Sequence, residues 1–301
     1  MKVKKAMPGK LRIRKLVVIG VGLIGGSFSL ALKRARMVKR VVGVGRTRRN
    51  LNAALRLGVI DEIATDAASA VQGADFVFLG TPVGQMAEVM SQIAPHLGPD
   101  AVITDGGSTK QDVIAHAERF LGSRYARFVP SHPIAGTENS GAAAAFAELF
   151  AGRTVILTPQ RAASAAAVRR VRDAWVACGA RVEKLDAKEH DEILAAVSHL
   201  PHVVAFALVS MLARGRDPAR RLRYSGGGLR DTVRIAGSSP EMWRDICMAN
   251  RDALTALLDD YLDELEAARS AIAAADGNAL MEMFTRARDA RARWLVKSRS
   301  Y

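Results

Sequence analysis

The sequence of 301 residues predicts an α/β protein in which a doubly wound parallel sheet is followed by an all-helical domain. Short runs of β-branched and aromatic residues alternate with helical stretches between residues 16 and 186. Each run is almost continuously apolar, as strands buried on both faces of a parallel sheet are. From residue 187 onward such runs disappear and apolar residues recur at spacings of three and four, which is typical of helices.

The first part, residues 16–186, is predicted to alternate strand and helix in regular order. Apolar segments bounded by Gly, Pro or Asp predict strands at Leu16–Gly20, Val41–Val44, Phe76–Gly80, Ala101–Thr104, Phe128–Pro130 and Thr154–Leu157. The stretches between them predict helices at Ser27–Arg40, Asn50–Leu57, Gly84–His96 and Lys110–Phe120. We expect this part to be one dinucleotide-binding domain for the reasons given below.

The second part, residues 187–301, is predicted to be helical throughout. A helix over Asp191–Arg214 is interrupted at Pro201, because proline removes a backbone hydrogen bond. Ser239 and Pro240 predict the start of a helix that runs for roughly 30 residues, and a final basic helix follows Asp276. A helix of that length with an apolar stripe suits packing against a second subunit. We therefore expect a homodimer that forms through the C-terminal helices.

Basic residues are concentrated at the N-terminus. The chain holds 44 Lys and Arg against 30 Asp and Glu, for a net charge of +14, and its first 60 residues contain 16 bases and no acid. A pI of about 10.3 is typical of nucleic-acid-binding proteins, so a basic nucleic-acid-binding module is one alternative. No recognition motif accompanies the charge. We expect residues 1–15 to form a flexible basic leader and expect no nucleic-acid partner.

Export and membrane insertion are not predicted. The basic start followed by the uncharged run from Leu16 to Leu32 is similar to a secretory signal, but four glycines interrupt the run and no cleavage site follows it. Cys178 and Cys247 are too few for a disulfide framework and lack metal-ligand spacing. The sequence therefore predicts a cytoplasmic protein without a membrane anchor.

A glycine-rich fingerprint joins the first predicted strand to the first predicted helix. In the GxGxxG segment, Gly20 permits a tight turn, Gly22 lets a pyrophosphate approach the backbone, and Gly25 allows close packing of helix on strand. The phosphates then lie on the helix N-terminus, where unpaired N–H groups favour anions. We expect a Rossmann-type dinucleotide site that also includes Leu23, Ile24, Thr81 and Pro82.

The acid that usually accompanies this fingerprint is missing. Enzymes that use NAD place Asp or Glu at the end of the second strand, where it accepts hydrogen bonds from the ribose hydroxyls. Here the segment from Val44 to Arg49 has no acid and contains Arg46 and Thr47, which suit a 2′-phosphate. A solvated basic loop would also explain the arginines. We expect NADP to be preferred, with NAD also possible.

Three further segments carry groups suited to chemistry. Asp105–Lys110 and Ser131–Glu138 each follow a predicted strand, and ligands bind at the carboxyl ends of strands in open α/β sheets. A histidine in such a place, here His132, is a natural general base. The glycine-rich segment from Ser225 to Arg234 precedes Trp243, and its arginine suits a carboxylate.

Together these segments resemble the prephenate/arogenate dehydrogenase family of tyrosine biosynthesis. The resemblance runs from Leu16 to about Asn250 and rests on four ordered motifs: GxGxxG, the GS-T-K turn, SHP-I-AG-T-E, and GGG-LRD-TVR-IA leading to Pro-Glu-Met-Trp. It implies an oxidative decarboxylation of prephenate or arogenate, in which hydride leaves C4 of the cyclohexadienol for NAD(P) and the ring carboxylate departs as CO2. The product is 4-hydroxyphenylpyruvate or tyrosine.

The resemblance also implies roles for individual residues. His132 matches the family's catalytic histidine, Ser108 the serine that orients the C4 hydroxyl, and Arg234 the arginine that pairs with a substrate carboxylate. Further substrate contacts are implied for His199, His202, Asp231, Trp243 and Glu138. Tyrosine is a possible feedback inhibitor at the active site.

Alternatives remain open from the sequence. A β-hydroxyacid dehydrogenase or imine reductase also pairs a Rossmann domain with a helical domain, but the lysine such enzymes use is missing from the helical half. A metal site among His190, His199 and His202 is disfavoured because hydride transfer needs no metal. Prephenate and arogenate differ only in a keto or amino group, so the sequence does not separate them.

Overall fold

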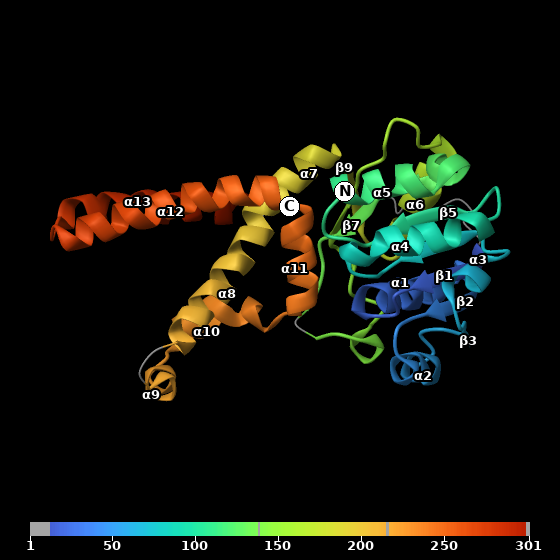
Figure 1. Ribbon diagram of the computed structural model, residues 1–301, viewed down its shortest axis with the longest axis horizontal. Helices are drawn as coiled ribbons and strands as arrows, with labels where there is room; N and C mark the ends of the chain where they lie inside the picture. Colours follow the sequence, from blue (N-terminus) through green and yellow to red (C-terminus); the bar gives the residue numbers. More distant parts are fainter. Residues whose placement is uncertain (1–12, 138, 215–216, 299–301) are drawn as a thin grey trace, which may run out of the picture. The chain divides into compact units, whose positions relative to one another are not determined.

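The computed structural model describes residues 13–137, 139–214 and 217–298 (Figure 1). Residues 1–12, most of the expected basic leader, lie outside the described residues, as does Glu138. The first strand begins at Ile13, so the last three residues of the expected leader belong to the sheet.

A six-stranded parallel sheet forms the first part of the structure. Its strands are β1 (Ile13–Ile19), β2 (Val38–Val44), β3 (Glu62–Ile63), β4 (Phe76–Leu79), β5 (Val102–Asp105) and β6 (Phe128–Val129). They follow the order β3-β2-β1-β4-β5-β6, and every neighbouring pair is parallel. The chain order reverses between β1 and β4, which is where ligands bind in doubly wound sheets. The predicted fold class is confirmed.

Helices cover both faces of this sheet. They are α1 (Leu23–Arg34), α2 (Arg48–Arg56), α3 (Ala67–Val71), α4 (Val83–Ile93), α5 (Gln111–Phe120) and α6 (Ala165–Ala177). Side chains alternate across β1: Leu16 and Val18 join the apolar cluster that includes α1 and α6, while Val17 and Ile19 join the cluster that includes α3, α4 and α5. Two-sided burial explains why the strands are almost continuously apolar.

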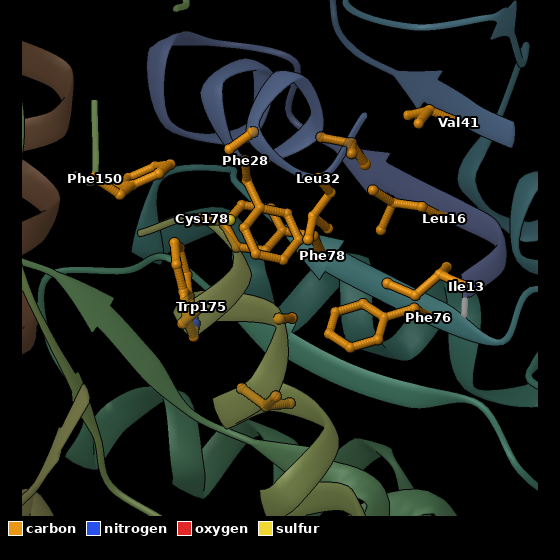
Figure 2. Packing of buried hydrophobic residues seen from close by; sticks show 14 of the residues in the cluster. Ile13, Leu16, Phe28, Leu32, Val41, Phe76, Phe78, Phe150, Trp175 and Cys178 are labelled. Carbon is orange, nitrogen blue, oxygen red and sulfur yellow. The ribbon is translucent and has the colours of Figure 1, made fainter. Parts of the chain in front are cut away.

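Several aromatic side chains pack together in the first of these two clusters (Figure 2). The rings of Phe28 and Phe78 are stacked at 4.5 Å between centroids, and Trp175 of α6 packs against Phe28 at 4.7 Å and Phe150 at 5.0 Å. The indole N–H of Trp175 donates to the Ser131 hydroxyl at 3.0 Å. The core is thereby tied to the residue that precedes His132.

One of the six expected strands, Thr154–Leu157, belongs to a second, smaller sheet. β7 (Ser131–Pro133), β8 (Thr154–Leu157) and β9 (Arg181–Lys184) form a three-stranded sheet in which β7 is antiparallel to β8. The prediction that Thr154–Leu157 extends the parallel sheet is therefore wrong. The chain leaves the parallel sheet after β6 and enters the smaller sheet at β7, with only Pro130 between the two strands.

Several helix boundaries differ from those predicted. The expected helix over Ser27–Arg40 begins earlier and ends at Arg34, because Arg36 adopts a left-handed conformation with φ of 57° and the chain enters β2 at Val38. The stretch Gly84–His96 is α4 followed by a 3-10 turn, Ala94–His96, that contains Pro95. The sequence did not predict α3, α6, β3, β7 or β9.

The described residues after Ala187 are helical where they have regular structure. The elements are α7 (Ala187–Leu194), a π-helical turn (Ala195–His199), α8 (Leu200–Ala213), α9 (Pro218–Arg223), α10 (Gly227–Val233), a 3-10 turn (Arg234–Gly237), α11 (Pro240–Ala249), α12 (Arg251–Ala273) and α13 (Gly277–Ser298). Ser239 caps α11 by accepting from the N–H of Met242, as predicted. The expected single helix of roughly 30 residues is instead two, because Asn250 leaves the helical conformation with ψ of 32°.

The chain forms two compact units, one up to Arg251 and one from Asp252 onward. The helices α7 to α11 thus belong to the same unit as the sheet. By length and composition alone, one described helical stretch, Ala187–Ala213, is apolar enough to cross a membrane, and 22% of its most apolar window is buried. A buried core helix passes the same test, so these properties are weak grounds for a membrane span.

Candidate active site

The glycine-rich loop packs tightly on one side and is open on the other. Gly20 has φ of 95°, and a Cβ there would meet the backbone of Gly80 at 2.5 Å. A Cβ at Gly25 would meet the Gly20 carbonyl oxygen at 2.4 Å, whereas a Cβ at Gly22 would meet nothing within 4 Å. The loop between β1 and α1 is therefore pressed against the end of β4 while Gly22 faces open space. That space is what a pyrophosphate needs in order to approach the backbone.

The N-terminus of α1 suits an anion. Gly22 is its N-cap and supplies no side-chain cap, so Leu23 and Ile24 begin the helix with backbone N–H groups that no capping side chain satisfies. Thr81 and Pro82 follow β4, the neighbour of β1, and the buried Thr81 hydroxyl has no hydrogen-bond partner among the described residues. A buried hydroxyl without a protein partner is free to bond to a ligand. These residues fit a dinucleotide.

The end of β2 carries the two residues predicted for a 2′-phosphate. Thr47 is the N-cap of α2, and its hydroxyl oxygen accepts from the Asn50 N–H at 3.4 Å, which leaves its O–H as a donor. Arg46 is exposed and donates to the Glu241 carboxylate of α11 at 2.8 Å. Both residues lie at the carboxyl end of β2, as expected, and Arg46 has a partner that the sequence did not reveal.

His132, on β7, stands at the end of a buried chain of hydrogen bonds. Its Nδ1 lies 2.9 Å from Nε2 of His190, and Nδ1 of His190 lies 2.7 Å from a carboxylate oxygen of Asp191. Asp191 also accepts from the backbone N–H groups of Lys110 and Gln111, at 2.8 and 2.9 Å, where α5 begins. Hydrogen bonds to the charged form of Asp191 lower its pKa despite burial.

The hydrogen bonds from Asp191 through His190 determine the tautomer of His132. An ionised carboxylate only accepts, so the Nδ1 of His190 must donate to Asp191 and its Nε2 must accept. The acceptor Nε2 of His190 then requires a proton on Nδ1 of His132. Nε2 of His132 is left without a proton, in the form that a general base requires.

Burial keeps the His132 ring neutral. Burial, with the neighbouring His190, Lys110 and His199, lowers the pKa of His132 well below its ordinary value of 6.5. At neutral pH the ring is therefore already deprotonated and able to accept a proton.

A second buried network fixes the strand that carries His132. The Lys110 ammonium, fully buried, pairs with Asp105 at the end of β5 and donates to the Ser131 carbonyl at 2.9 Å. Asp105 also accepts from the N–H groups of Ser131 and Gly107, at 3.0 and 2.8 Å. Asp105 and Lys110 lie at the two ends of the turn that holds Ser108. Both are therefore hydrogen-bonded to Ser131, the residue before His132.

The helical residues of the site gather around Trp243 of α11. The His202 ring is stacked on the indole, with 3.6 Å between centroids, and donates from Nδ1 to the Ser198 carbonyl. Burial is the main cause of the lowered pKa of His202, and the nearby Arg234 guanidinium lowers it further. His202 therefore lies beside Trp243 and close to Arg234.

His199 connects this group to His132. Asn250 donates to Nδ1 of His199 at 3.2 Å and also to the backbone carbonyl of Asp191 at 2.7 Å. Burial lowers the pKa of His199 to about 4. Its Nε2 and the indole nitrogen of Trp243 are both buried without a partner among the described residues. Two such N–H donors fit an acceptor on a ligand, such as a carboxylate or carbonyl oxygen.

Two other predicted site residues, Asp231 and Ser108, have no described contact with His132 or Trp243. Asp231 lies exposed on α10, and Ser108 lies half-buried in the turn after β5. The predicted contact at Glu138 lies outside the described residues. Among the residues that the structure describes, no group of three or more His, Cys, Asp or Glu is arranged to hold a metal ion.

Sequence reasoning missed the supporting residues. The sequence does not predict that Lys110, His190, Asp191 and Asn250 support His132, and it offers His190 only as a member of the disfavoured metal site. The adjacent pair His190-Asp191 at a helix start was a weak signal. Its partner His132 is 58 positions away, so only the folded chain shows the contact.

Comparison with known proteins agrees with this arrangement. The family model described as "Prephenate dehydrogenase, nucleotide-binding domain" matches residues 28–184, and "Prephenate dehydrogenase, dimerization domain" matches residues 186–286. A cyclohexadienyl dehydrogenase of Zymomonas mobilis is 39% identical over 282 residues, which covers 92% of this chain and 95% of that protein.

Two solved structures are also similar. Prephenate dehydrogenase from A. aeolicus, in complex with hydroxyphenyl propionate and NAD+, has a TM-score of 0.87 and 34% identity and covers 95% of this chain and 99% of its own. Synechocystis arogenate dehydrogenase has a TM-score of 0.75 and 28% identity, and covers 93% of this chain and 99% of its own. The chain belongs to the prephenate dehydrogenase family of NAD(P)-dependent oxidoreductases.

Proposed function

We propose that His132 is the general base in the oxidative decarboxylation of prephenate, arogenate or both. The observation that carries this role is the hydrogen-bonded chain from His132 through His190 to Asp191, which leaves Nε2 as an acceptor on a neutral ring. Nε2 accepts the proton of the C4 hydroxyl, and Asp191, acting through His190, stabilises the single imidazolium that forms. The nicotinamide, when bound, accepts the hydride that leaves C4.

Other residues bind and orient the substrate in this proposal. Arg234 pairs with a substrate carboxylate, and the unpartnered N–H groups of His199 and Trp243 donate to substrate oxygens. Ser108 orients the C4 hydroxyl from the turn that the buried Lys110 fastens. His202, Asp231 and Glu138 complete the set of contacts. Tyrosine, which presents a phenol and a carboxylate like the products, is proposed to compete at the same place.

The cofactor is proposed to be NADP in preference to NAD. The glycine loop, Thr81 and Pro82 hold the pyrophosphate and ribose, and the donors at Arg46 and Thr47 suit a 2′-phosphate. Support comes from the missing acid between Val44 and Arg49. A nicotinamide cofactor itself follows from the family.

The two parts of the chain are proposed to have different functions. Residues 16–186 are proposed to bind the dinucleotide, and residues 187–301 to bind substrate and form a homodimer. The exposed apolar side chains of α8, α12 and α13 support the dimer: Val209, Met211, Leu262, Leu265, Ile272, Met281 and Phe284. The free thiols of Cys178 and Cys247 support a reducing, cytoplasmic location.

Steady-state kinetics with prephenate and arogenate, each paired with NAD and NADP, tests the proposal. Substitution of His132 by Asn should lower kcat by about 10²- to 10⁴-fold in a folded protein, because proton transfer loses its acceptor. Near-normal turnover by the variant would refute the role of His132. Higher kcat/KM with NAD than with NADP would refute the cofactor preference.

A further inference from the structure

Glu241 occupies a position between two strand ends of the dinucleotide site. It lies in the first turn of α11, and its Oε1 accepts from Arg46, which is 195 positions earlier in the chain. Gln85, in the first turn of α4, donates to the same oxygen at 3.3 Å. Arg46 follows β2, and Gln85 follows the turn after β4. Because β2 and β4 are the two neighbours of β1, the carboxylate stands over the point where the strand order reverses.

This is where the ribose of a dinucleotide is recognised. In Rossmann-type sites a carboxylate at the end of β2 accepts from the ribose hydroxyls, and it disfavours a 2′-phosphate by charge repulsion. The chain has no acid before Asp61, so β2 supplies none. The fold instead brings a carboxylate to this place from α11. Both side chains remain within reach of a ligand, since Glu241 is 40% and Arg46 is 66% exposed.

The carboxylate is ionised under ordinary conditions. The hydrogen bond and charge of Arg46 lower the pKa of Glu241, and Arg244 adds to the effect. An ionised Glu241 neutralises the guanidinium that a 2′-phosphate would bind. The phosphate must therefore displace the carboxylate from Arg46 and then remain close to a negative charge. NAD meets neither obstacle.

We propose that Glu241 is a specificity-determining residue for the dinucleotide, because it competes with a 2′-phosphate for Arg46. The proposal rests on the placement of the 2′-phosphate at Arg46 in the proposed function. Glu241 thereby narrows the proposed preference for NADP over NAD without reversing it. Removal of the negative charge increases the preference for 2′-phosphorylated ligands.

Equilibrium binding separates this role from catalysis. Adenosine 2′,5′-bisphosphate and 5′-AMP report the 2′-phosphate contact without turnover, and isothermal titration calorimetry measures both affinities. Glu241→Gln should tighten binding of the bisphosphate by about 3- to 10-fold and leave 5′-AMP unchanged or weaker, as expected for loss of one competing exposed ion pair. Glu241→Asp, which keeps the charge, should keep the wild-type ratio of the two affinities.

A matched control removes a similar ion pair elsewhere. Glu148 pairs with Arg34 at the far end of α1, and Glu148→Gln should leave both affinities unchanged. If Glu241→Gln changes neither ligand, or shifts both equally, or weakens the bisphosphate, the role of Glu241 is overturned.

The Arg46→Gln variant separates the role of Glu241 from the placement of the 2′-phosphate at Arg46. Weaker binding of the bisphosphate by this variant supports the placement of the 2′-phosphate. If Arg46→Gln weakens it while Glu241→Gln has no effect, only the role of Glu241 fails. If Arg46→Gln leaves the bisphosphate unaffected, the placement itself is wrong, and both proposals lose their support.

Discussion

At the scale of single residues, the orientation of the His132 ring depends on two other buried side chains. His190 holds the Nδ1 proton of His132 in place, and Asp191 does the same for His190. The two backbone N–H groups at the start of α5 hold Asp191 in turn. The protonation state of one ring nitrogen, Nε2 of His132, thus depends on three elements of the fold.

Removal of His190 should therefore slow the chemical step. We expect His190→Ala to lower kcat by at least about 10-fold with little change in the KM for the cyclohexadienol, since the tautomer of His132 is no longer fixed. His190→Gln can accept from His132 through its amide oxygen and donate to Asp191, so it should restore part of the rate. Steady-state kinetics on both variants measures the effect, and equal kcat for all three proteins would contradict the role of His190.

At the scale of elements, the two ends of the glycine loop have different functions. Gly25 is required for packing, because a Cβ would lie 2.4 Å from the Gly20 carbonyl oxygen and 2.8 Å from Val18. Gly22 has no such neighbour. The same substitution at the two positions can therefore separate stability from binding.

We expect Gly25→Ala to lower the free energy of unfolding by about 1–3 kcal/mol, the usual cost of an overpacked position. Gly22→Ala should leave the stability nearly unchanged but weaken binding of ADP-ribose by about 10-fold or more, because its Cβ enters the space that the pyrophosphate needs. Denaturant titration and calorimetry check the two effects. Equal stability of the variants, or full affinity in Gly22→Ala, would show that the loop does not work in this way.

Elements were predictable where the local sequence determines them. β1, β2, β4 and β5 are apolar, β-branched and bounded by breakers, so their existence follows from the sequence alone. β3 has two residues, and β9 has the charged sequence RVEK, because each lies at the edge of its sheet. β7 contains polar residues and Pro133. These strands carry no apolar pattern and exist only because a neighbour pairs with them.

The residues of the site were predictable where they lie in local motifs, but the contacts between distant residues were not. His132, Trp243 and Arg234 lie in recognisable motifs, but the sequence does not predict that His202 stacks on Trp243. Contacts such as Arg46 to Glu241 join residues that are far apart in the chain, and tertiary packing alone sets them. The π-helical turn Ala195–His199 is similar: Pro201 predicts a distortion, but not the wide turn that places His199 beside Asn250.

At the scale of the whole molecule, buried neutral histidines make stability depend on pH. The pKa of His199 is about 4 in the folded protein against an ordinary value of 6.5. Between these values the unfolded chain binds a proton that the folded chain does not, so stability falls as the pH falls below 6.5.

We expect His199 to contribute a loss of about 2 kcal/mol in the free energy of unfolding between pH 7 and pH 5. His132, whose pKa is also lowered by burial, adds to the loss in the same direction. Urea titrations of wild type and His199→Asn at both pH values measure the difference. A variant with an unchanged pH dependence would contradict the assignment of His199 as a buried neutral group.

The proposed dimer has its own test. Leu265 of α12 is 48% exposed, and Leu55 of α2 is a matched exposed leucine at 41%. Leu265→Glu should shift the protein from dimer toward monomer, because a charge is costly at an apolar interface, while Leu55→Glu should not. Size-exclusion chromatography with light scattering reports the mass of each. A wild-type monomer, or a dimer that tolerates Leu265→Glu, would exclude α12 from the interface.

The apolar stretch Ala187–Ala213, which includes α8, has a consequence for how the protein is made. A single copy exposes Val197 at 69% and Met211 at 55%, within the stretch Ala187–Ala213 that is apolar enough to cross a membrane. If the proposed dimer covers this surface, a newly synthesised protomer exposes it until a second chain binds, and aggregation competes with assembly. Thermal stability should then rise with protein concentration, and the yield in a cell should depend on how quickly two chains meet.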